Sequence, residues 1–279
     1  FSNNVYLGKV GGELLVFGGR NQSRATDQVY TLRREKFAEN EETLPVRLYG
    51  HCVVTHPYSN KVYIIGGYHG RVDENNGISS DVWLMDYSKE PPETVLLNSL
   101  KTPRMKHMCE IMVEVGKTGL DEWKIIVAGG FDGTNSLDSI EIFDIRDDTD
   151  YNQWINSSST LNQAIHGGDM VSKSNVFYEL AIFGGKSIGR GFSNIVTTLS
   201  WNATKNDVDV NDESPLNYAR ADFVVIDTTV SFCPTNPPPE PTEAPTDPPT
   251  EASTEAPTNP PTDPTTEATT EMTLPDPKN

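Results

Sequence analysis

The chain has 279 residues, of which 35% are hydrophobic, and its 22 basic and 40 acidic residues give a net charge of −18 at pH 7. A charge of this sign argues against nucleic acid or an anionic membrane surface as a general partner. No apolar run reaches the roughly 18 to 20 residues of a membrane-spanning helix, so we expect no membrane insertion.

A hydrophobic segment that ends in two glycines occurs four times along the chain. The glycine pairs are Gly18-Gly19, Gly66-Gly67, Gly129-Gly130 and Gly184-Gly185. The apolar residues before each pair do not alternate with polar ones, which predicts a strand that is covered on both faces. The glycines predict positive φ angles, or a close approach of a neighbouring backbone, at the end of each strand.

Each unit also carries signals for the strands on either side of this segment. Before it, short β-prone stretches begin near Cys52, Cys109 and Asp169. After it, another β-prone stretch begins at Val29, Val82, Ile140 and Ile195. Outer strands are indicated at Thr94–Leu97 and Asp150–Trp154. Four strands per unit predict an all-β repeat protein built from propeller blades.

These units resemble those of the kelch-repeat family, and the third unit is the closest match. There the glycine pair is followed by Phe131-Asp132-Gly133, then by the strand Ser139–Asp144 and by Trp154. The resemblance spans residues 1–233 and implies a kelch-type β-propeller of four-stranded blades. Four repeats are clear and residues 217–226 look like part of another, so we expect a truncated or incomplete ring.

Residues 234–279 differ sharply in composition. They include 14 Pro and 12 Thr, and their nine acids and one lysine give a charge of −8. Without large apolar side chains, this segment cannot offset the entropy of ordering, so we predict a propeller domain over 1–233 and a disordered tail over 234–279. Repeats such as Pro-Thr-Glu-Ala-Pro-Thr are typical of O-glycosylated, mucin-like stalks. An unmodified acidic linker is the alternative.

Three sequons for N-glycosylation lie in the predicted propeller, at Asn21, Asn156 and Asn202. Together with the mucin-like tail, they favour a secreted or extracellular protein. The chain begins at Phe1 without a methionine or a signal peptide, so we expect a processed protein or a fragment.

Three cysteines leave the redox state open. Cys52 and Cys109 lie at nearly equivalent places in adjacent units, and Cys233 stands at the end of the predicted propeller. A disulfide could join any two of them in a secreted protein. Alternatively, the thiols could pack as small hydrophobic groups in buried strands.

Two sets of residues are compatible with metal binding. His51, His107 and His166 occupy comparable positions at the start of three units, although hydrogen bonding between blades is the simpler interpretation. The acidic runs Asp144–Asp150 and Asp207–Glu213 alternate oxygens as calcium loops do, but lack the glycine and glutamate of a helix-loop-helix site. We interpret them as solvated loops, and we expect no metal and no cofactor.

The loops after the glycine pairs are the candidate ligand-binding surface, because loops on a rigid scaffold commonly carry specificity. The first and fourth of these loops are basic, and the second carries an insertion. The candidate residues are Arg20, Arg24, His69, Arg71, Lys186 and Arg190. If the ring brings the first and fourth units together, they form a basic sector that suits an acidic peptide or a sulfated glycan.

These features favour non-enzymatic extracellular recognition of a protein or glycan partner. An intracellular kelch adaptor, which presents ubiquitin-ligase substrates or binds actin, is the first alternative. The resemblance also reaches galactose-oxidase-like enzymes, whose copper site uses Tyr and His ligands and a Cys–Tyr cross-link. No such pairing of Tyr and His stands out in this sequence. The sequence does not define an oligomeric state.

Overall fold

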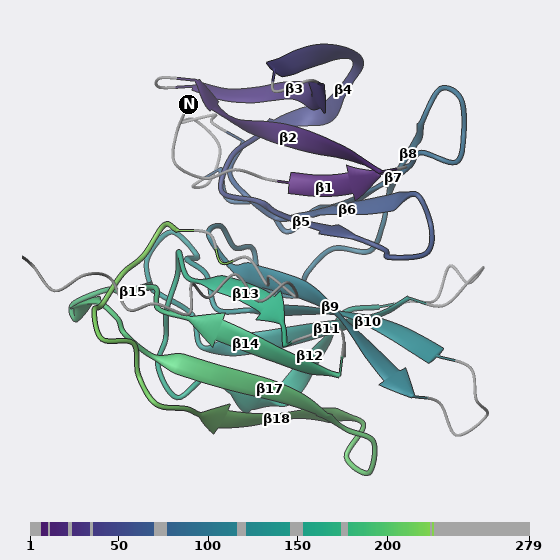
Figure 1. The fold of residues 1–279 in the computed structure, drawn as a ribbon. Coiled ribbons are helices and arrows are strands. Elements are labelled where there is room, and N and C mark those ends of the chain that lie inside the picture. Colours follow the sequence, from purple (N-terminus) through teal and green to yellow (C-terminus); the bar gives the residue numbers. More distant parts are fainter. Residues whose placement is uncertain are drawn as a thin grey trace, which may run out of the picture. The chain divides into compact units, whose positions relative to one another are not determined.

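The structure is a computed structural model, and it describes residues 7–10, 12–21, 24–33, 36–69, 77–115, 121–145, 153–173, 178–223 and 225. The chain divides into two units, Phe1–Phe232 and Cys233–Asn279, and all the described residues belong to the first. The predicted disordered, mucin-like tail therefore lies outside them. Every regular element among the described residues is a β-strand (Figure 1). No helix in this part of the chain is long and apolar enough to cross a membrane.

The described strands form four four-stranded antiparallel sheets and one short hairpin. Sheet 1 contains β1 (Leu7–Val10), β2 (Glu13–Asn21), β3 (Arg24–Arg33) and β4 (Lys36–Leu48). Sheet 2 contains β5 (Cys52–Thr55), β6 (Lys61–Ile65), β7 (Val82–Asp86) and β8 (Glu93–Leu96). Sheet 3 contains β9 (Met108–Val115), β10 (Asp121–Ala128), β11 (Ser139–Ile145) and β12 (Ile155–Thr160). Sheet 4 contains β13 (Asp169–Ser172), β14 (Glu179–Phe183), β17 (Val196–Asn202) and β18 (Asp207–Asp212), and the hairpin contains β15 (Lys186–Ser187) and β16 (Gly191–Phe192).

Strands within each sheet are hydrogen bonded in chain order, as can be followed in Figure 1. This repeated up-and-down order is that of propeller blades, so the predicted all-β fold class is confirmed. The predicted apolar segments lie in the second strands β2, β6, β10 and β14. The glycine pair follows the strand in three of them, whereas β2 continues through Gly18 and Gly19 to Asn21, so the predicted strand end is wrong there. Val29, Val82 and Ile140 lie in third strands as predicted, and Ile195 directly precedes β17.

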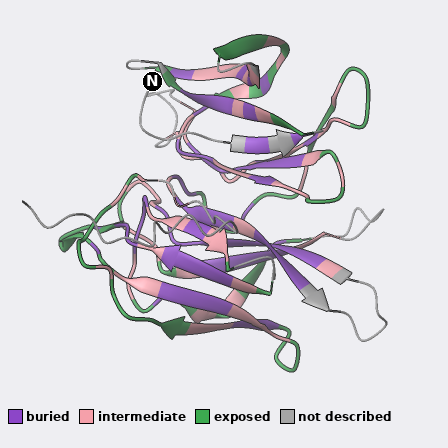
Figure 2. Cartoon of the chain, in the orientation of Figure 1, coloured by how far each residue is buried: buried purple, intermediate pink, exposed green. Residues whose placement is uncertain are grey.

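Hydrophobic cores lie between neighbouring sheets. In β6, Val62 and Ile64 belong to the core that sheet 2 shares with sheet 1, whereas Tyr63 and Ile65 belong to the core that it shares with sheet 3. All four side chains are buried, and Figure 2 shows β2 and β14 mostly buried, in contrast to the largely exposed outer strand β4. Both faces of these second strands are covered, which explains why their apolar residues do not alternate with polar ones.

The glycine pairs connect each unit to the next by a backbone hydrogen bond, and we call this contact the glycine latch. All eight glycines have positive φ, between 58° and 109°. The second glycine donates its N–H to a carbonyl at the start of the following unit: Gly67 to Arg104 at 2.9 Å, and Gly130 to Ile165 at 2.8 Å. The first glycine lies close to the same carbonyl: a Cβ on Gly66 would lie only 2.6 Å from the oxygen of Arg104. Glycine is therefore required both for its conformation and for this close approach.

The outer strand of sheet 3 differs from the prediction. β12 begins at Ile155, after the predicted Asp150–Trp154, and residues 146–152 lie outside the described residues. Trp154 is instead a buried core residue, and its indole N–H donates to the carbonyl of Asn98 at 3.0 Å. The serine-rich composition of β12 hid this strand from sequence reasoning, because serine has no preference for strands.

The predicted solvated loop at Asp207–Glu213 is also wrong, because most of it forms β18. The buried carboxylate of Asp207 accepts hydrogen bonds from the hydroxyls of Ser157 (2.5 Å) and Ser158 (2.6 Å), and from the backbone N–H groups of Ser158 and Val208. Burial alone would raise the pKa of Asp207, but these hydrogen bonds outweigh it and leave the pKa below its usual value. Both serines belong to β12, so Asp207 joins the outer strands of sheets 3 and 4.

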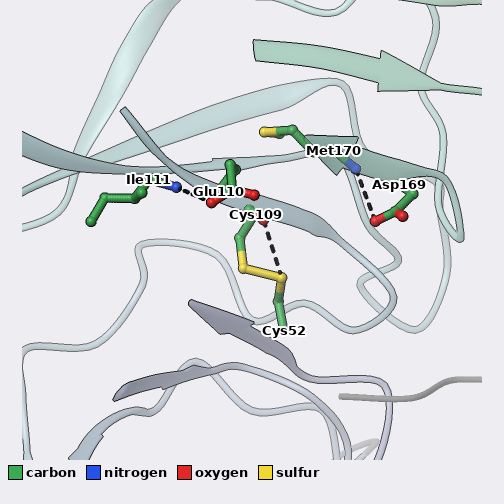
Figure 3. The surroundings of a disulfide bond; sticks show 6 residues. All are labelled: Cys52, Cys109, Glu110, Ile111, Asp169 and Met170. Atoms are coloured by element: carbon green, nitrogen blue, oxygen red, sulfur yellow. Dashed lines mark hydrogen bonds between the residues drawn. A yellow bond between two sulfur atoms is a disulfide. The ribbon is translucent and has the colours of Figure 1, made fainter. Parts of the chain in front are cut away.

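Cys52 and Cys109 form a disulfide with their Cα atoms 6.1 Å apart, and it joins the first strands of sheets 2 and 3 (Figure 3). Cys52 pairs with the residue directly before a glycine pair, whereas Cys109 pairs one position further back. Successive side chains of a strand point to opposite faces, so this offset turns the two sulfur atoms toward each other. Disulfides form and persist in oxidising compartments, so the bridge favours such a compartment. Cys233 lies outside the described residues.

Candidate ligand-binding face

A turn with positive φ at its centre opens each of four successive units. The central residues are Gly50 (68°), Lys106 (51°), Gly167 (66°) and Asp222 (54°). Their backbones are linked in series: Lys106 N–H donates to Gly50 O at 2.6 Å, Gly167 N–H to Lys106 O at 2.7 Å, and Asp222 N–H to Gly167 O at 2.6 Å. Asp222 lies in the predicted partial repeat, so the described residues of that stretch open a fifth unit.

The loops that follow the glycine pairs lie beside these turns. The first residue of a loop exchanges two backbone hydrogen bonds with the residue that precedes a turn centre. The pairs are Tyr68 with Tyr49, Phe131 with Met105, and Lys186 with His166. We call these six residues, together with Arg20, the loop face. In units 2 to 4 its backbone is fixed by the same bonds while its side chains differ, as in many binding surfaces.

In units 1 and 2 the loop face brings together two tilted aromatic rings and a cation. The rings of Tyr49 and Tyr68 lie 5.1 Å apart, and the exposed guanidinium of Arg20 lies 5.5 Å from the centre of the Tyr49 ring. Burial raises the pKa of Tyr49, and the charge of Arg20 opposes this shift. Beyond Tyr68, the imidazole of His69 lies 3.8 Å from the carboxylate of Asp81. These contacts leave Arg20 as the exposed cation of this half.

In units 3 and 4 the loop face gathers cations around an imidazole. The ring of His166 lies 5.5 Å from that of Phe131, and its Nδ1 lies 3.0 Å from the hydroxyl of Ser136. Burial lowers the pKa of His166, and the nearby charges of Lys106 and Lys186 lower it further. His166 is therefore neutral at pH 7. The ammonium group of Lys106 lies 2.8 Å from the carboxylate of Asp222, so the exposed Lys186 supplies the positive charge of this half.

The hairpin of β15 and β16 extends the fourth loop. It carries the predicted cations Lys186 and Arg190, and both are exposed. Ile188 and Phe192 stand beside them with 52% and 63% of their surface exposed. The ammonium group of Lys186 lies 5.9 Å from the centre of the Phe192 ring. Sequence reasoning identified the two cations and overlooked the two apolar side chains.

The three candidate histidines do not occupy one register. His51 and His107 directly follow turn centres, whereas His166 precedes one, which corrects the prediction of comparable positions. His51 donates through Nε2 to the carbonyl of Phe17 at 3.0 Å. Burial lowers the pKa of His51 to about 3, and burial with the charge of Arg104 lowers that of His107 well below its usual value. Within the described ranges, no three His, Cys, Asp or Glu side chains are grouped to hold a metal.

The predicted glycosylation sites fall in different surroundings. Asn156 is exposed on the outer strand β12. Asn202 ends β17, where its Nδ2 donates to the carboxylate of Asp209 at 2.7 Å and its Oδ1 accepts the N–H groups of Thr204 and Lys205. The side chain of Asn21 lies outside the described residues. Asn156 is therefore the more accessible of the two described sites.

The remaining loop candidates, Arg24 and Arg71, add little to the loop face. Arg24 is exposed and pairs across the β2–β3 hairpin with Asn21. Arg71 lies outside the described residues. The structure thus brings Arg20 to Tyr49 in the first half of the loop face, and places Lys186 and Arg190 on one hairpin in the second half.

A buried ion pair supports the third unit, and sequence reasoning missed it. Arg104 Nη2 lies 2.6 Å from Glu141 Oε1, and both side chains are fully buried. Arg104 also donates to the carbonyl of Gly129 at 2.7 Å, and Glu141 accepts the N–H of Lys101 at 2.7 Å. The one available signal was a glutamate between isoleucines in β11. Because both side chains are fully buried, the pair stabilises the fold and is not part of the loop face.

Fold and loop face together define a repeat of propeller blades that presents variable loops on a fixed backbone. Residues 124–149, which begin in β10 and include β11, match the Kelch motif. Comparison with curated proteins finds no match to the chain. The Kelch motif falls on the third unit, where the sequence resemblance was closest. The chain therefore contains a kelch repeat, which suggests a β-propeller binding module.

Proposed function

We propose that the protein is a non-enzymatic recognition module of the secretory route that binds a protein or glycan partner through the loop face. The observation that carries this proposal is the loop face itself: exposed cations and aromatic rings stand on a backbone fixed by repeated hydrogen bonds. Such a preformed surface loses little conformational entropy on binding. His51 and His107 are buried and neutral, so we assign them a structural role rather than a role in binding.

The secretory location rests on three independent features. The disulfide between Cys52 and Cys109 favours an oxidising compartment. Asn156 heads a sequon on an exposed strand, and the Pro/Thr-rich residues 234–279 have the composition of an O-glycosylated stalk. The sequon and the tail composition also occur in intracellular proteins, whereas a disulfide is rare there, so the disulfide carries most of this argument.

The location is tested by the intact mass of the protein isolated from the cells that make it, before and after enzymatic removal of glycans. Thiol labelling of the same sample reports the disulfide. We expect glycan mass on Asn156 and on tail threonines, together with one protected cysteine pair. An unmodified mass with three free thiols would contradict the proposal and favour the intracellular adaptor.

Binding is tested with two defined probes, a displayed library of random peptides and an array of sulfated and neutral glycans. We expect the chain to select ligands from one of them, and Arg20→Gln to weaken their binding. A control is Lys173→Gln, because Lys173 follows β13 at the end of sheet 4 opposite the loop face. A copper-oxidase function would instead require stoichiometric copper and a tyrosyl radical in the purified protein, which metal analysis and electron paramagnetic resonance measure.

A further inference from the structure

The β15–β16 hairpin is an addition to the four-strand plan of its unit. Gly189 lies in its tip and Gly191 begins the return strand β16, and their φ angles are 78° and 82°. A Cβ built on either glycine would meet no atom within 4 Å, so the tip is free of neighbouring side chains. These two positions of the hairpin therefore face open space.

The base of this hairpin is firmly held. Lys186 and His166 exchange backbone hydrogen bonds of 2.9 and 2.7 Å, and the N–H of Ile188 donates to the hydroxyl of Ser136 at 2.9 Å. Ser187 between them is buried. On the return strand, Ser193 N–H donates to the carbonyl of Gly185 at 2.8 Å. These bonds attach the hairpin to sheets 3 and 4, so it is presented in one orientation before any partner arrives.

The side chains on this hairpin suit a contact surface. Ile188 and Phe192 are half or more exposed, on an element too short to gain stability from them. Lys186 and Arg190 flank them. Apolar side chains surrounded by polar groups are typical of interaction sites, and a few such residues commonly supply most of the binding energy.

The charges of the chain decide between the partners that such a tip could meet. An anionic membrane would attract Lys186 and Arg190 but would repel the rest of a chain whose net charge is −18. A sulfated glycan would bind the cations, but its many hydroxyl and sulfate groups suit the exposed apolar side chain of Ile188 less well than a protein surface does. A protein with an apolar depression rimmed by carboxylates satisfies both kinds of side chain.

We propose that the β15–β16 hairpin is a contact finger whose Ile188 and Phe192 enter an apolar site on a partner protein while Lys186 and Arg190 pair with carboxylates at its rim. This inference rests on the proposed recognition function, and it names the hairpin as the main contact with the partner. The firm base lowers the entropic cost of binding, because the finger is already ordered in the free protein.

The experiment selects peptides from a displayed random library on the full chain and measures their affinities for paired variants. One variant is Ile188→Ser with Phe192→Ser, and another is Lys186→Gln with Arg190→Gln. Tyr178→Ser is the apolar control, since Tyr178 is 46% exposed directly before β14, at the end of sheet 4 opposite the loop face. Lys173→Gln with Lys205→Gln is the charge-matched control at that same end. Thermal unfolding verifies that each variant is folded.

We expect the selected peptides to combine acidic with apolar residues, and to bind each hairpin variant at least about tenfold more weakly while binding the controls unchanged. Peptides that ignore the hairpin variants but respond to Arg20→Gln would overturn the finger and leave the recognition function standing. Binding of heparin, or of phosphatidylserine vesicles, that depends on the hairpin without any peptide ligand would assign the finger to another partner class and overturn the proposal. A chain that selects no ligand of any class would overturn both.

Discussion

The interface between sheets 2 and 3 and the interface between sheets 3 and 4 share one backbone pattern and differ in their polar groups. Both have an apolar core and a glycine latch. The first adds the disulfide and the buried pair of Arg104 and Glu141, whereas the second adds the serine bonds to Asp207. The repeat therefore dictates how blades stack, and individual residues decide how strongly each stack is held.

Two buried groups, Glu110 beside sheet 4 and His107 beside sheet 2, respond to acid in opposite directions. Burial raises the pKa of Glu110, on the face of β9 toward sheet 4, to about 7. Folding thus favours its protonated form, so Glu110 lowers stability as the pH rises above about 4.5. At His107 folding favours the neutral form, which lowers stability as the pH falls. Substitutions that remove one group at a time separate these contributions.

We expect the largest loss from Arg104→Leu. This change leaves Glu141 as an unpaired charge in a fully buried site, and such breaks cost about 3 to 5 kcal/mol. Urea unfolding measures the loss. The double variant Arg104→Leu with Glu141→Leu should recover part of it, because no buried charge remains. A single variant within about 1 kcal/mol of the parent would show that water or a rearrangement solvates Glu141.

Removing the disulfide should cost about 2 to 4 kcal/mol, because the bridge closes a loop of 57 residues in the unfolded chain. The variant is Cys52→Ala with Cys109→Ala, measured by urea unfolding against the oxidised parent. Reduction of the parent should produce a similar loss. Equal stability of all three proteins would mean that the bridge does not constrain the unfolded chain.

Between pH 7 and pH 5, protonation of His107 in the unfolded chain should lower the free energy of unfolding by about 2 kcal/mol, and His107→Phe should remove this loss. The unfolded histidine gains a proton below about pH 6.5, and the buried one does not, so its contribution is complete above that pH and is lost as the pH falls. Phenylalanine fits, since Phe223 packs against Gly184 as His107 packs against Gly66. The measurement is the difference in unfolding free energy between the variant and the parent at pH 7 and pH 5. An unchanged difference would mean that His107 is protonated in the fold.

Asp207→Ala should cost about 1 to 3 kcal/mol, since it removes the acceptor of several hydrogen bonds between sheets 3 and 4. Hydrogen exchange should rise in β12 and β18 while it stays unchanged in sheet 2. Asp209→Ala is a matched control on the same strand, with its carboxylate bound to the exposed Lys205. Equal losses from both substitutions would show that Asp207 is no special link between the sheets.

The backbone plan of this protein was predictable from its sequence because glycine pairs and unbroken apolar segments have few physical explanations. A segment such as Val62–Ile65 must be covered on both faces. Gly66 must lack a side chain, because the carbonyl oxygen of Arg104 occupies the place of a Cβ. Cys52 and Cys109 were predicted to lie at nearly equivalent places in adjacent units, but their pairing depends on a one-residue offset in register that spacing does not reveal.

The candidate site was predictable only in part. The exposed cations Arg20, Lys186 and Arg190 stood out by charge. Ile188 and Phe192 did not, because an isolated apolar residue in a loop gives no sign of whether it is buried. The serine-rich β12 was hidden for a related reason: its side chains are fixed by Asp207, which lies about 50 residues further along the chain.

The most direct test of recognition through the loop face is the affinity of library-selected ligands for Arg20→Gln with Lys186→Gln, compared with Lys173→Gln with Lys205→Gln. Both pairs remove two positive charges from exposed positions, at opposite ends of the sheets. We predict that the first pair weakens binding at least about tenfold and that the second leaves it unchanged. Equal affinities for the two pairs would contradict the proposed function.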